Sequence, residues 1–261
     1  MASTSWDPNQ YLRFAAERSR PCRDLLVRIE MPRVLRVVDL GSGPGNSTGL
    51  LLDRWPEAEI TGVDNSVEMI AAARKERPAV RWMVEDIAQW AATTEGKFDV
   101  VFSNAALQWV DNHAELLPRL MARVELDGAL AFQVPYNFDA AAHRLMREIA
   151  ASSSWRKWFP EGAVREWHVH DVAFYYDVLA AHARNVDLWE TEYIHVMPDA
   201  AAIVEWYKGS GMRPFLDAIH SAEDRERFTA DFLERIRAAF PKRADGRVLF
   251  PFRRLFAIAS L

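Results

Sequence analysis

The chain has 261 residues, of which 50% are apolar and 26% are charged, so it can bury a sizeable core and is not disordered. Its 32 basic and 37 acidic side chains give a net charge of −5, which argues against a general nucleic-acid binder. The single cysteine, Cys22, excludes a disulfide framework and a multi-cysteine zinc or iron–sulfur site.

The first ten residues, MASTSWDPNQ, contain neither a basic nor an apolar segment, so we expect no signal peptide. No apolar run approaches the roughly 20 residues that a membrane-spanning helix needs. These features predict a cytoplasmic protein that binds neither membrane nor nucleic acid, and no obligate protein partner is evident.

Strands alternate with helices from the start of the chain to Pro135. Strands are expected at residues 36–40, 59–64, 80–84, 98–103 and, after a turn at Asp127-Gly128, 129–134. Helices are expected at residues 8–30 (with a break at Pro21), 46–54, 66–77 and 113–124. Capping candidates are Asn46, Ser47 and Thr48 for the second helix, and Asn65 and Ser66 for the third. Nearly continuous apolar strands separated by helices predict a buried parallel sheet that is open and doubly wound.

After Pro135 the pattern becomes mainly helical. Helices are expected at 139–151, 171–183, 199–209 and 222–239, strands at 186–196 and 247–259, and an irregular insertion at 152–168. We expect a single domain over 1–261. In it, residues 1–33 form an N-terminal helical cap, and roughly 136–240 supply helical insertions that form a lid over the carboxyl ends of the strands.

A glycine-rich loop follows the first strand, in the sequence Asp39-Leu40-Gly41-Ser42-Gly43-Pro44-Gly45. Closely spaced glycines between a strand and a helix let a ligand approach the backbone. Asn46 stands where the dinucleotide fingerprint has its third glycine, so the spacing departs from the NAD-binding pattern. Asp64, at the end of the second strand, is suited to accept hydrogen bonds from two ribose hydroxyls. The alternative is an ordinary strand–helix turn in which Asp64 caps the following helix.

Polar residues follow four of the expected strands, and ligands of open α/β sheets bind outside the carboxyl ends of the strands. The segments VVDLGSGPGNST, ITGVDNS, MVEDI and NAALQW together resemble the class I S-adenosylmethionine-dependent methyltransferases. The resemblance implies a Rossmann-like sheet of about seven strands with the last strand antiparallel. It also implies S-adenosylmethionine as cofactor, with S-adenosylhomocysteine as product. The implied cofactor-binding residues are Asp39, Gly41, Gly43, Gly45, Asn46, Asp64, Asn65, Met69, Asp86, Ile87, Asn104 and Trp109. In this set, Asp86 would hold the adenine amino group and Met69 would pack on the adenine face.

The resemblance extends over nearly the whole chain to methyltransferases that esterify a small organic acid. It is carried by WDPNQYLRFAAERSRP, FQVPYNF, MREIA, AFYYDVL, MPDAAAIVEW, GMRPFL and FPFRRLFAIA. A carboxylate is already ionised at neutral pH, so we expect no general base and no catalytic acid–base residue. Guanidinium groups suit carboxylates, and residues 13–36 and 241–254 each carry a net charge of +4. The substrate-binding candidates are Tyr11, Arg18, Arg20, Tyr136, Arg213 and Arg253, with Arg254 as the alternative to Arg253.

Other interpretations remain open at this point. The acceptor could be another small carboxylic acid or a thioester-linked acid. A different class of enzyme would be an NAD-dependent oxidoreductase, and a non-catalytic binding module could retain the same fold. His168, His170 and Asp171 are residue types that bind metals, but their position before a helix favours surface or capping roles, so we expect no metal.

Overall fold

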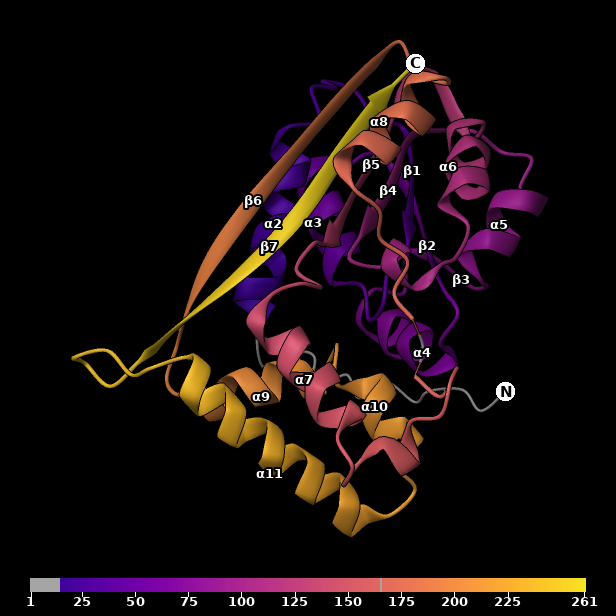
Figure 1. Ribbon diagram of the computed structural model, residues 1–261. Coiled ribbons are helices and arrows are strands. Elements are labelled where there is room, and N and C mark those ends of the chain that lie inside the picture. The colour runs from indigo at the N-terminus through magenta and orange to yellow at the C-terminus, as the bar shows by residue number, and fades with distance from the viewer. Residues whose placement is uncertain (1–14, 165) are drawn as a thin grey trace. The chain divides into compact units, whose positions relative to one another are not determined.

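The computed structural model describes residues 15–164 and 166–261, and its central feature is a mixed β-sheet (Figure 1). The strands are β1 (Arg36–Leu40), β2 (Glu59–Asp64), β3 (Arg81–Val84), β4 (Phe98–Asn104), β5 (Val124–Pro135), β6 (Asn185–Met197) and β7 (Val248–Ser260). Across the described sheet they follow the order β3-β2-β1-β4-β5-β7-β6. Strands β1 to β5 pair in parallel, whereas β7 runs antiparallel to β5. The predicted seven-stranded, doubly wound sheet with an antiparallel last strand is confirmed.

Helices connect the strands. They are α2 (Ala15–Val27), α3 (Asn46–Arg54), α4 (Val67–Glu76), α5 (Ile87–Thr93), α6 (His113–Met121), α7 (Ala141–Ala151), α8 (Val172–Ala180), α9 (Ala200–Lys208), α10 (Arg213–Ala218) and α11 (Ala222–Ala239). In the part of the chain that the structure describes, 3₁₀ turns are η1 (Leu107–Trp109) and η2 (Arg156–Trp158). Figure 1 shows α2 and α3 on one side of the sheet and α5 and α6 on the other. Among the described residues, none of the helices combines the length and the apolar character needed to cross a bilayer.

The described chain divides into two compact units. The sheet unit contains the described residues up to Pro135, together with Trp167–Thr191 and Arg254–Leu261. The helical unit contains the described residues of Tyr136–Glu166 and of Glu192–Arg253, and in it α11 packs against α7 and α9. Strands β6 and β7 each contribute residues to both units.

Each unit has its own core. In the sheet unit, Val37 and Val38 of β1 and Val100 and Val101 of β4 are fully buried, as parallel strands covered on both faces should be. The core of the helical unit contains aromatic rings as well as aliphatic side chains. Its fully buried rings include those of Phe228 and Phe232, which lie on one face of α11 at the spacing expected for an amphipathic helix.

Two short helices differ from the sequence expectation, which placed none at α5 or α10. Helix α5 begins after Asp86, whose Oδ1 accepts hydrogen bonds from the backbone N–H groups of Ala88 (2.8 Å) and Gln89 (3.2 Å). It is seven residues long and α10 is six. Segments this short complete fewer than two turns, so helical periodicity gives little signal in the sequence.

One of the two expected interruptions is wrong. Pro21 lies inside α2 rather than breaking it. Burial of Cys22, Leu25 and Leu26 outweighs the backbone hydrogen bond that a proline removes. The expected turn at Asp127-Gly128 is present as a local irregularity inside a longer strand. Strand β5 begins at Val124, Asp127 is left-handed (φ 63°), and after a shift in register the pairing with β4 resumes at Ala129, where the strand was expected to begin.

Candidate active site

Three glycines shape the loop between β1 and α3, and all have positive φ: 71° at Gly41, 54° at Gly43 and 90° at Gly45. A Cβ atom on Gly41 would collide with the Ala106 side chain, and one on Gly45 would lie 2.9 Å from the Trp82 ring. A Cβ atom on Gly43 would meet no atom within 4 Å. The outer glycines therefore permit close packing, whereas Gly43 leaves the backbone open to a ligand.

Asp39, on β1, is fully buried beneath this loop. Its Oδ2 accepts hydrogen bonds from Ser47 Oγ (2.7 Å) and Thr48 Oγ1 (2.6 Å), while its buried Oδ1 has no hydrogen-bond partner in the described part of the chain. Burial raises the pKa of this carboxyl to about 6, against the lowering effect of the two hydroxyls. The unused oxygen is thus an acceptor that a ligand donor or cation would satisfy.

The predicted capping role of Asn46, Ser47 and Thr48 is wrong. The N-cap residue of α3 is Gly45, in a left-handed conformation and without a side-chain cap. The hydroxyls of Ser47 and Thr48 point instead to Asp39, because a fully buried carboxylate needs hydrogen-bond donors.

Asp64, at the end of β2, is attached to the same loop. Its Oδ2 accepts a hydrogen bond from the backbone N–H of Gly43 (2.9 Å), and its Oδ1 accepts one from that of Ser66 (2.9 Å). Burial raises the pKa of Asp64, and these backbone bonds oppose the shift. Ser66 caps α4 as expected by accepting from the N–H of Met69 (3.2 Å), so the alternative of Asp64 as the cap is excluded.

The predicted adenine-side residues occupy different environments. Asp86 is exposed and uses Oδ1 to cap α5, whereas Ile87 and Met69 are buried, and Asn65 is exposed. The Cδ1 atom of Ile87 would lie 3.6 Å from a Cβ atom on Gly41, which places Ile87 beside the glycine loop. Contact of these residues with adenine stays a prediction.

Asn104, at the end of β4, belongs to a chain of side-chain hydrogen bonds that sequence reasoning missed. Arg254 Nη1 donates to Gln133 Oε1 (3.0 Å), and Gln133 Nε2 donates to Asn104 Oδ1 (2.7 Å). Gln133 is fully buried and Arg254 is 4% exposed. The FQVP segment that contains Gln133 carries part of the family resemblance, but no local pattern indicates that this glutamine contacts an arginine 121 positions later.

The turn after β4 is held by a buried histidine. His113 Nε2 lies 2.9 Å from the carbonyl oxygen of Leu107, and Nδ1 lies 2.9 Å from Tyr175 Oη. Because a carbonyl only accepts, Nε2 carries the proton, and burial lowers the pKa of His113 so that the ring is neutral. These bonds anchor η1, whose last residue, Trp109, packs edge-on against Trp167 with ring centroids 5.1 Å apart.

The predicted substrate-binding residues are distributed over both units. Tyr11 lies outside the described residues. The backbone of Arg18 belongs to α2, but its side chain is not among the parts that the structure describes. Arg20 is exposed on α2. In the helical unit, Tyr136 and Arg253 are brought together.

Arg253 Nε donates to the Tyr136 carbonyl oxygen (3.1 Å), and its guanidinium carbon lies 5.1 Å from the Tyr136 ring centroid. Arg213 Nε is 3.4 Å from Asp217 Oδ1 within α10. Binding of substrate by any of these residues stays a prediction.

The histidine-rich segment before α8 has structural contacts of its own. The backbone N–H of His168 donates to the Gln108 carbonyl oxygen (2.9 Å), the His170 ring stacks on Phe174, and Asp171 caps α8. Over residues 15–164 and 166–261, no group of three or more His, Cys, Asp or Glu side chains could hold a metal ion.

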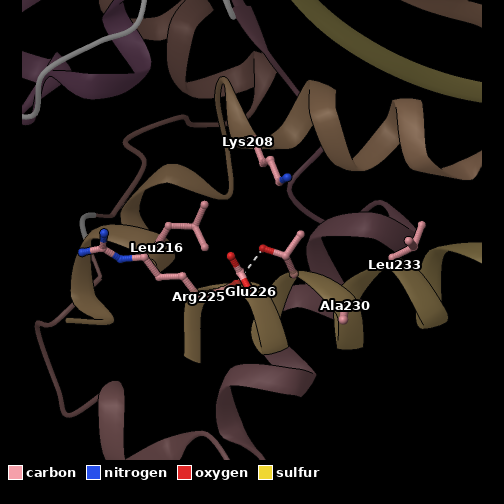
Figure 2. A pocket seen from close by; sticks show the side chains of 7 residues that line it. Lys208, Leu216, Arg225, Glu226, Ala230 and Leu233 are labelled. Carbon is pink, nitrogen blue, oxygen red and sulfur yellow. Dashed lines mark hydrogen bonds between the residues drawn. The ribbon is translucent and has the colours of Figure 1, made fainter. Parts of the chain in front are cut away.

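A cavity of about 430 Å³ lies within the helical unit (Figure 2). It is lined by Lys208, Leu216, Arg225, Glu226, Thr229, Ala230 and Leu233. Lys208 Nζ is 2.8 Å from Glu205 Oε1, and Arg225 Nε donates to the Ile219 carbonyl oxygen (2.6 Å). Since both cations already have protein acceptors, we assign no ligand to this cavity.

Comparison with known proteins places the chain in a family. A trans-aconitate 2-methyltransferase from Azoarcus sp. is 47% identical over 255 residues, which cover 98% of each chain. The chain belongs to the trans-aconitate 2-methyltransferase family. Residues 37–128, which include the glycine loop, Asp64 and Asn104, match the methyltransferase domain family. The predicted class of enzyme and its cofactor, S-adenosylmethionine, are therefore confirmed.

Solved structures confirm the fold. The phosphoethanolamine N-methyltransferase 2 of Haemonchus contortus, in complex with S-adenosyl-L-methionine, matches 92% of this chain and 52% of its own with 16% identity and a TM-score of 0.55. The YcgJ protein of Bacillus subtilis matches 92% of this chain and 97% of its own with 14% identity and a TM-score of 0.57. At these identities the similarity concerns architecture alone.

Proposed function

We propose that this chain transfers a methyl group from S-adenosylmethionine to one carboxylate of trans-aconitate, releasing the monomethyl ester and S-adenosylhomocysteine. The observation that carries the proposal is the similarity to an enzyme named for this substrate over 98% of both chains. That similarity spans both units, so it includes the residues expected to select the acceptor as well as the cofactor loop.

The residues at the carboxyl ends of β1 and β2 fit the cofactor. Buried Asp39 Oδ1 is the acceptor suited to the ammonium group of its methionine part, and Asp64 is suited to its ribose hydroxyls. Gly43 provides the open backbone between them. When bound, the cofactor supplies an electrophilic methyl group on a positively charged sulfur. The prediction that Met69, Asp86 and Ile87 hold the adenine belongs to the same proposal.

The chain's own task is to hold the acceptor and exclude water. A carboxylate needs no deprotonation at neutral pH, because its reference pKa is near 4. Transfer by in-line displacement therefore needs no general base, and orientation of the two reactants can supply roughly 7–11 kcal/mol of the rate enhancement. Water favours separated charges over a transition state in which they partly cancel, so a closed site accelerates the reaction.

Three carboxylates are costly to remove from water without cations, and we propose that arginines provide them. The candidates are Arg18, Arg20, Arg213 and Arg253, with Tyr11 and Tyr136 as hydrogen-bond donors and Trp109 as a wall. Guanidinium groups bind carboxylates through two parallel hydrogen bonds, which fixes orientation as well as charge.

Turnover with labelled S-adenosylmethionine across a panel of di- and tricarboxylic acids tests the proposal. We expect trans-aconitate to be the preferred acceptor and mass spectrometry to show one added methyl group per molecule. Preference for another small carboxylic acid or a thioester-linked acid would overturn the substrate assignment. The absence of turnover with every acid would indicate a non-catalytic module. A thermal shift with NAD but none with S-adenosylhomocysteine would favour an oxidoreductase.

A further inference from the structure

Three polar side chains form a continuous hydrogen-bonded chain within the sheet unit, from β7 through β5 to β4. Arg254 and Gln133 are both almost completely buried, and Asn104 lies at the carboxyl end of β4. The register of the sheet places Asn104 beside Gln133 and Arg254 beside Pro135. The backbone N–H of Ala105 also donates to the Gln133 carbonyl oxygen (3.0 Å), so the residue after Asn104 is fixed from the same position.

The chain of bonds has only one possible direction. A guanidinium group can donate hydrogen bonds but cannot accept them, so Gln133 must turn its Oε1 toward Arg254. The Nε2 of Gln133 then donates to Asn104, which must accept this hydrogen bond with Oδ1. The remaining polar group of Asn104 is its Nδ2, which carries two donors. A residue two positions away in the hydrogen-bond chain thus determines whether Asn104 offers donors or an acceptor.

We propose that Arg254 and Gln133 are positioning residues that set Asn104 as a donor to a carboxylate oxygen of a bound reactant. The inference rests on the proposed function, in which both reactants carry carboxylates: the methionine part of the cofactor and the acceptor acid. An ammonium group is not the partner of Asn104 Nδ2, because both are donors. The buried Oδ1 of Asp39 is the matching acceptor for that ammonium. Polarisation along a chain that begins at a cation also strengthens the final donor.

A purely structural role for these side chains would predict something different. Strands β4, β5 and β7 are already paired through their backbones over six or more residue pairs on each side of β5. If the side chains served only to join the strands, substituting them would lower activity only as far as it lowers the stability of the fold. If they orient Asn104, activity or ligand affinity changes while the folded protein stays stable.

The deciding variant is Gln133→Glu, which preserves shape and keeps an acceptor for Arg254. Its second oxygen can only accept, so Asn104 must turn Nδ2 toward it and offer Oδ1 to the ligand instead. We expect a midpoint of thermal unfolding close to that of the wild type. We also expect the affinity for one of the two reactants to fall by about 10- to 100-fold, which is the range for a hydrogen bond to a charged group. A rise in KM for trans-aconitate assigns the carboxylate to the acceptor, and weaker S-adenosylhomocysteine binding by calorimetry assigns it to the cofactor.

A second pair of variants keeps the test decisive if Gln133→Glu does not fold. Arg254→Lys retains a donor-only group, whereas Arg254→Met removes it and lets both amides rotate. We expect Arg254→Lys to recover most of the activity that Arg254→Met loses, compared at equal folded fraction. The inference is overturned if the wild type is active and the folded Gln133→Glu variant has a KM, a kcat and a cofactor affinity all within about twofold of the wild-type values. If Gln133→Glu does not fold, the same result for Arg254→Met overturns it. If wild type does not methylate trans-aconitate at all, the proposed function fails, and the calorimetric measurement alone decides the inference.

Discussion

The sheet unit and the helical unit use buried side chains in different ways. In the sheet unit, Asp39 receives two hydroxyl donors and Asp64 receives two backbone donors, so each carboxylate has a fixed direction. In the helical unit the core includes closely packed rings, such as Tyr207 against Phe232 (5.8 Å between centroids) and Trp155 against Phe228 (5.2 Å). Directional bonds tolerate little change, whereas close-packed apolar volume can be redistributed among neighbours. Directional hydrogen bonds suit the binding of a cofactor that does not vary, and apolar packing suits adaptation to an acceptor.

The largest effect that we expect from a single substitution is on cofactor affinity, when Asp39 of the sheet unit is replaced. We expect Asp39→Ala to weaken S-adenosylhomocysteine binding by about 100-fold or more, because a buried charged hydrogen bond contributes about 3 kcal/mol. Isothermal titration calorimetry measures this. Thr48→Ala is the matched control, since it removes one donor to Asp39 but leaves the carboxylate, and its loss should be much smaller. Equal losses in the two variants would show that Asp39 acts only through packing.

Arg253 provides the corresponding test in the helical unit. We expect Arg253→Ala to raise KM for trans-aconitate by about 10- to 50-fold through loss of a bidentate contact, with S-adenosylhomocysteine affinity unchanged. Steady-state kinetics at saturating cofactor measure the change. Arg243→Ala, which removes another exposed arginine nearby in the sequence, should leave KM unaltered. An Arg253 variant with wild-type kinetics would remove this residue from the acceptor site.

The pH dependence of cofactor binding should report on the sheet unit alone. Burial raises the pKa of Asp39 to about 6, and only the ionised carboxylate can accept the ammonium group. Affinity for S-adenosylhomocysteine should therefore be constant above pH 7 and fall by up to about tenfold per pH unit below pH 6. Titrations from pH 5 to 8 measure it, and Asp39→Asn should bind weakly and lose the part of the pH dependence that comes from Asp39. A wild-type profile that is flat across this range would contradict the assignment.

A smaller effect distinguishes the glycines of the loop. Gly41→Ala forces a side chain against Ala106, so we expect it to destabilise the fold by about 1–3 kcal/mol beyond the left-handed strain common to both positions. Gly43→Ala has open space and should cost only about 1 kcal/mol in strain while still obstructing the cofactor. Chemical denaturation together with calorimetric titration separates stability from binding. A Gly43 variant that binds normally would show that the open space is not used.

The sheet unit could be predicted from sequence in more detail than the helical unit, for physical reasons. Asp64 and the glycine loop are close in sequence to the strands that position them, so strand order alone places them at one edge. Gln133 and Arg254 meet only because β7 pairs with β5, a contact between distant segments that no local pattern encodes. Likewise, the hydroxyls of Ser47 and Thr48 are equally suited to capping and to Asp39, and the burial of Asp39 decides between these roles.

Arg253 and Arg254 also show that a contact between distant strands decides what the local sequence does not. Both are adjacent arginines before an apolar segment, and the sequence left them as alternatives. Side chains alternate across a strand, so only the register determines which one is buried. In β7 that residue is Arg254, and Arg253 is exposed.

The division of β7 has a consequence for how this enzyme can vary. Its residues up to Arg253 belong to the helical unit and those from Arg254 onward belong to the sheet unit, so an exposed and a buried arginine are neighbours in the chain. A shift of a strand by a single position exchanges its two faces. We therefore expect the gain or loss of one residue in this strand to be more damaging than replacement of the exposed Arg253, because it would exchange the exposed and the buried arginine together.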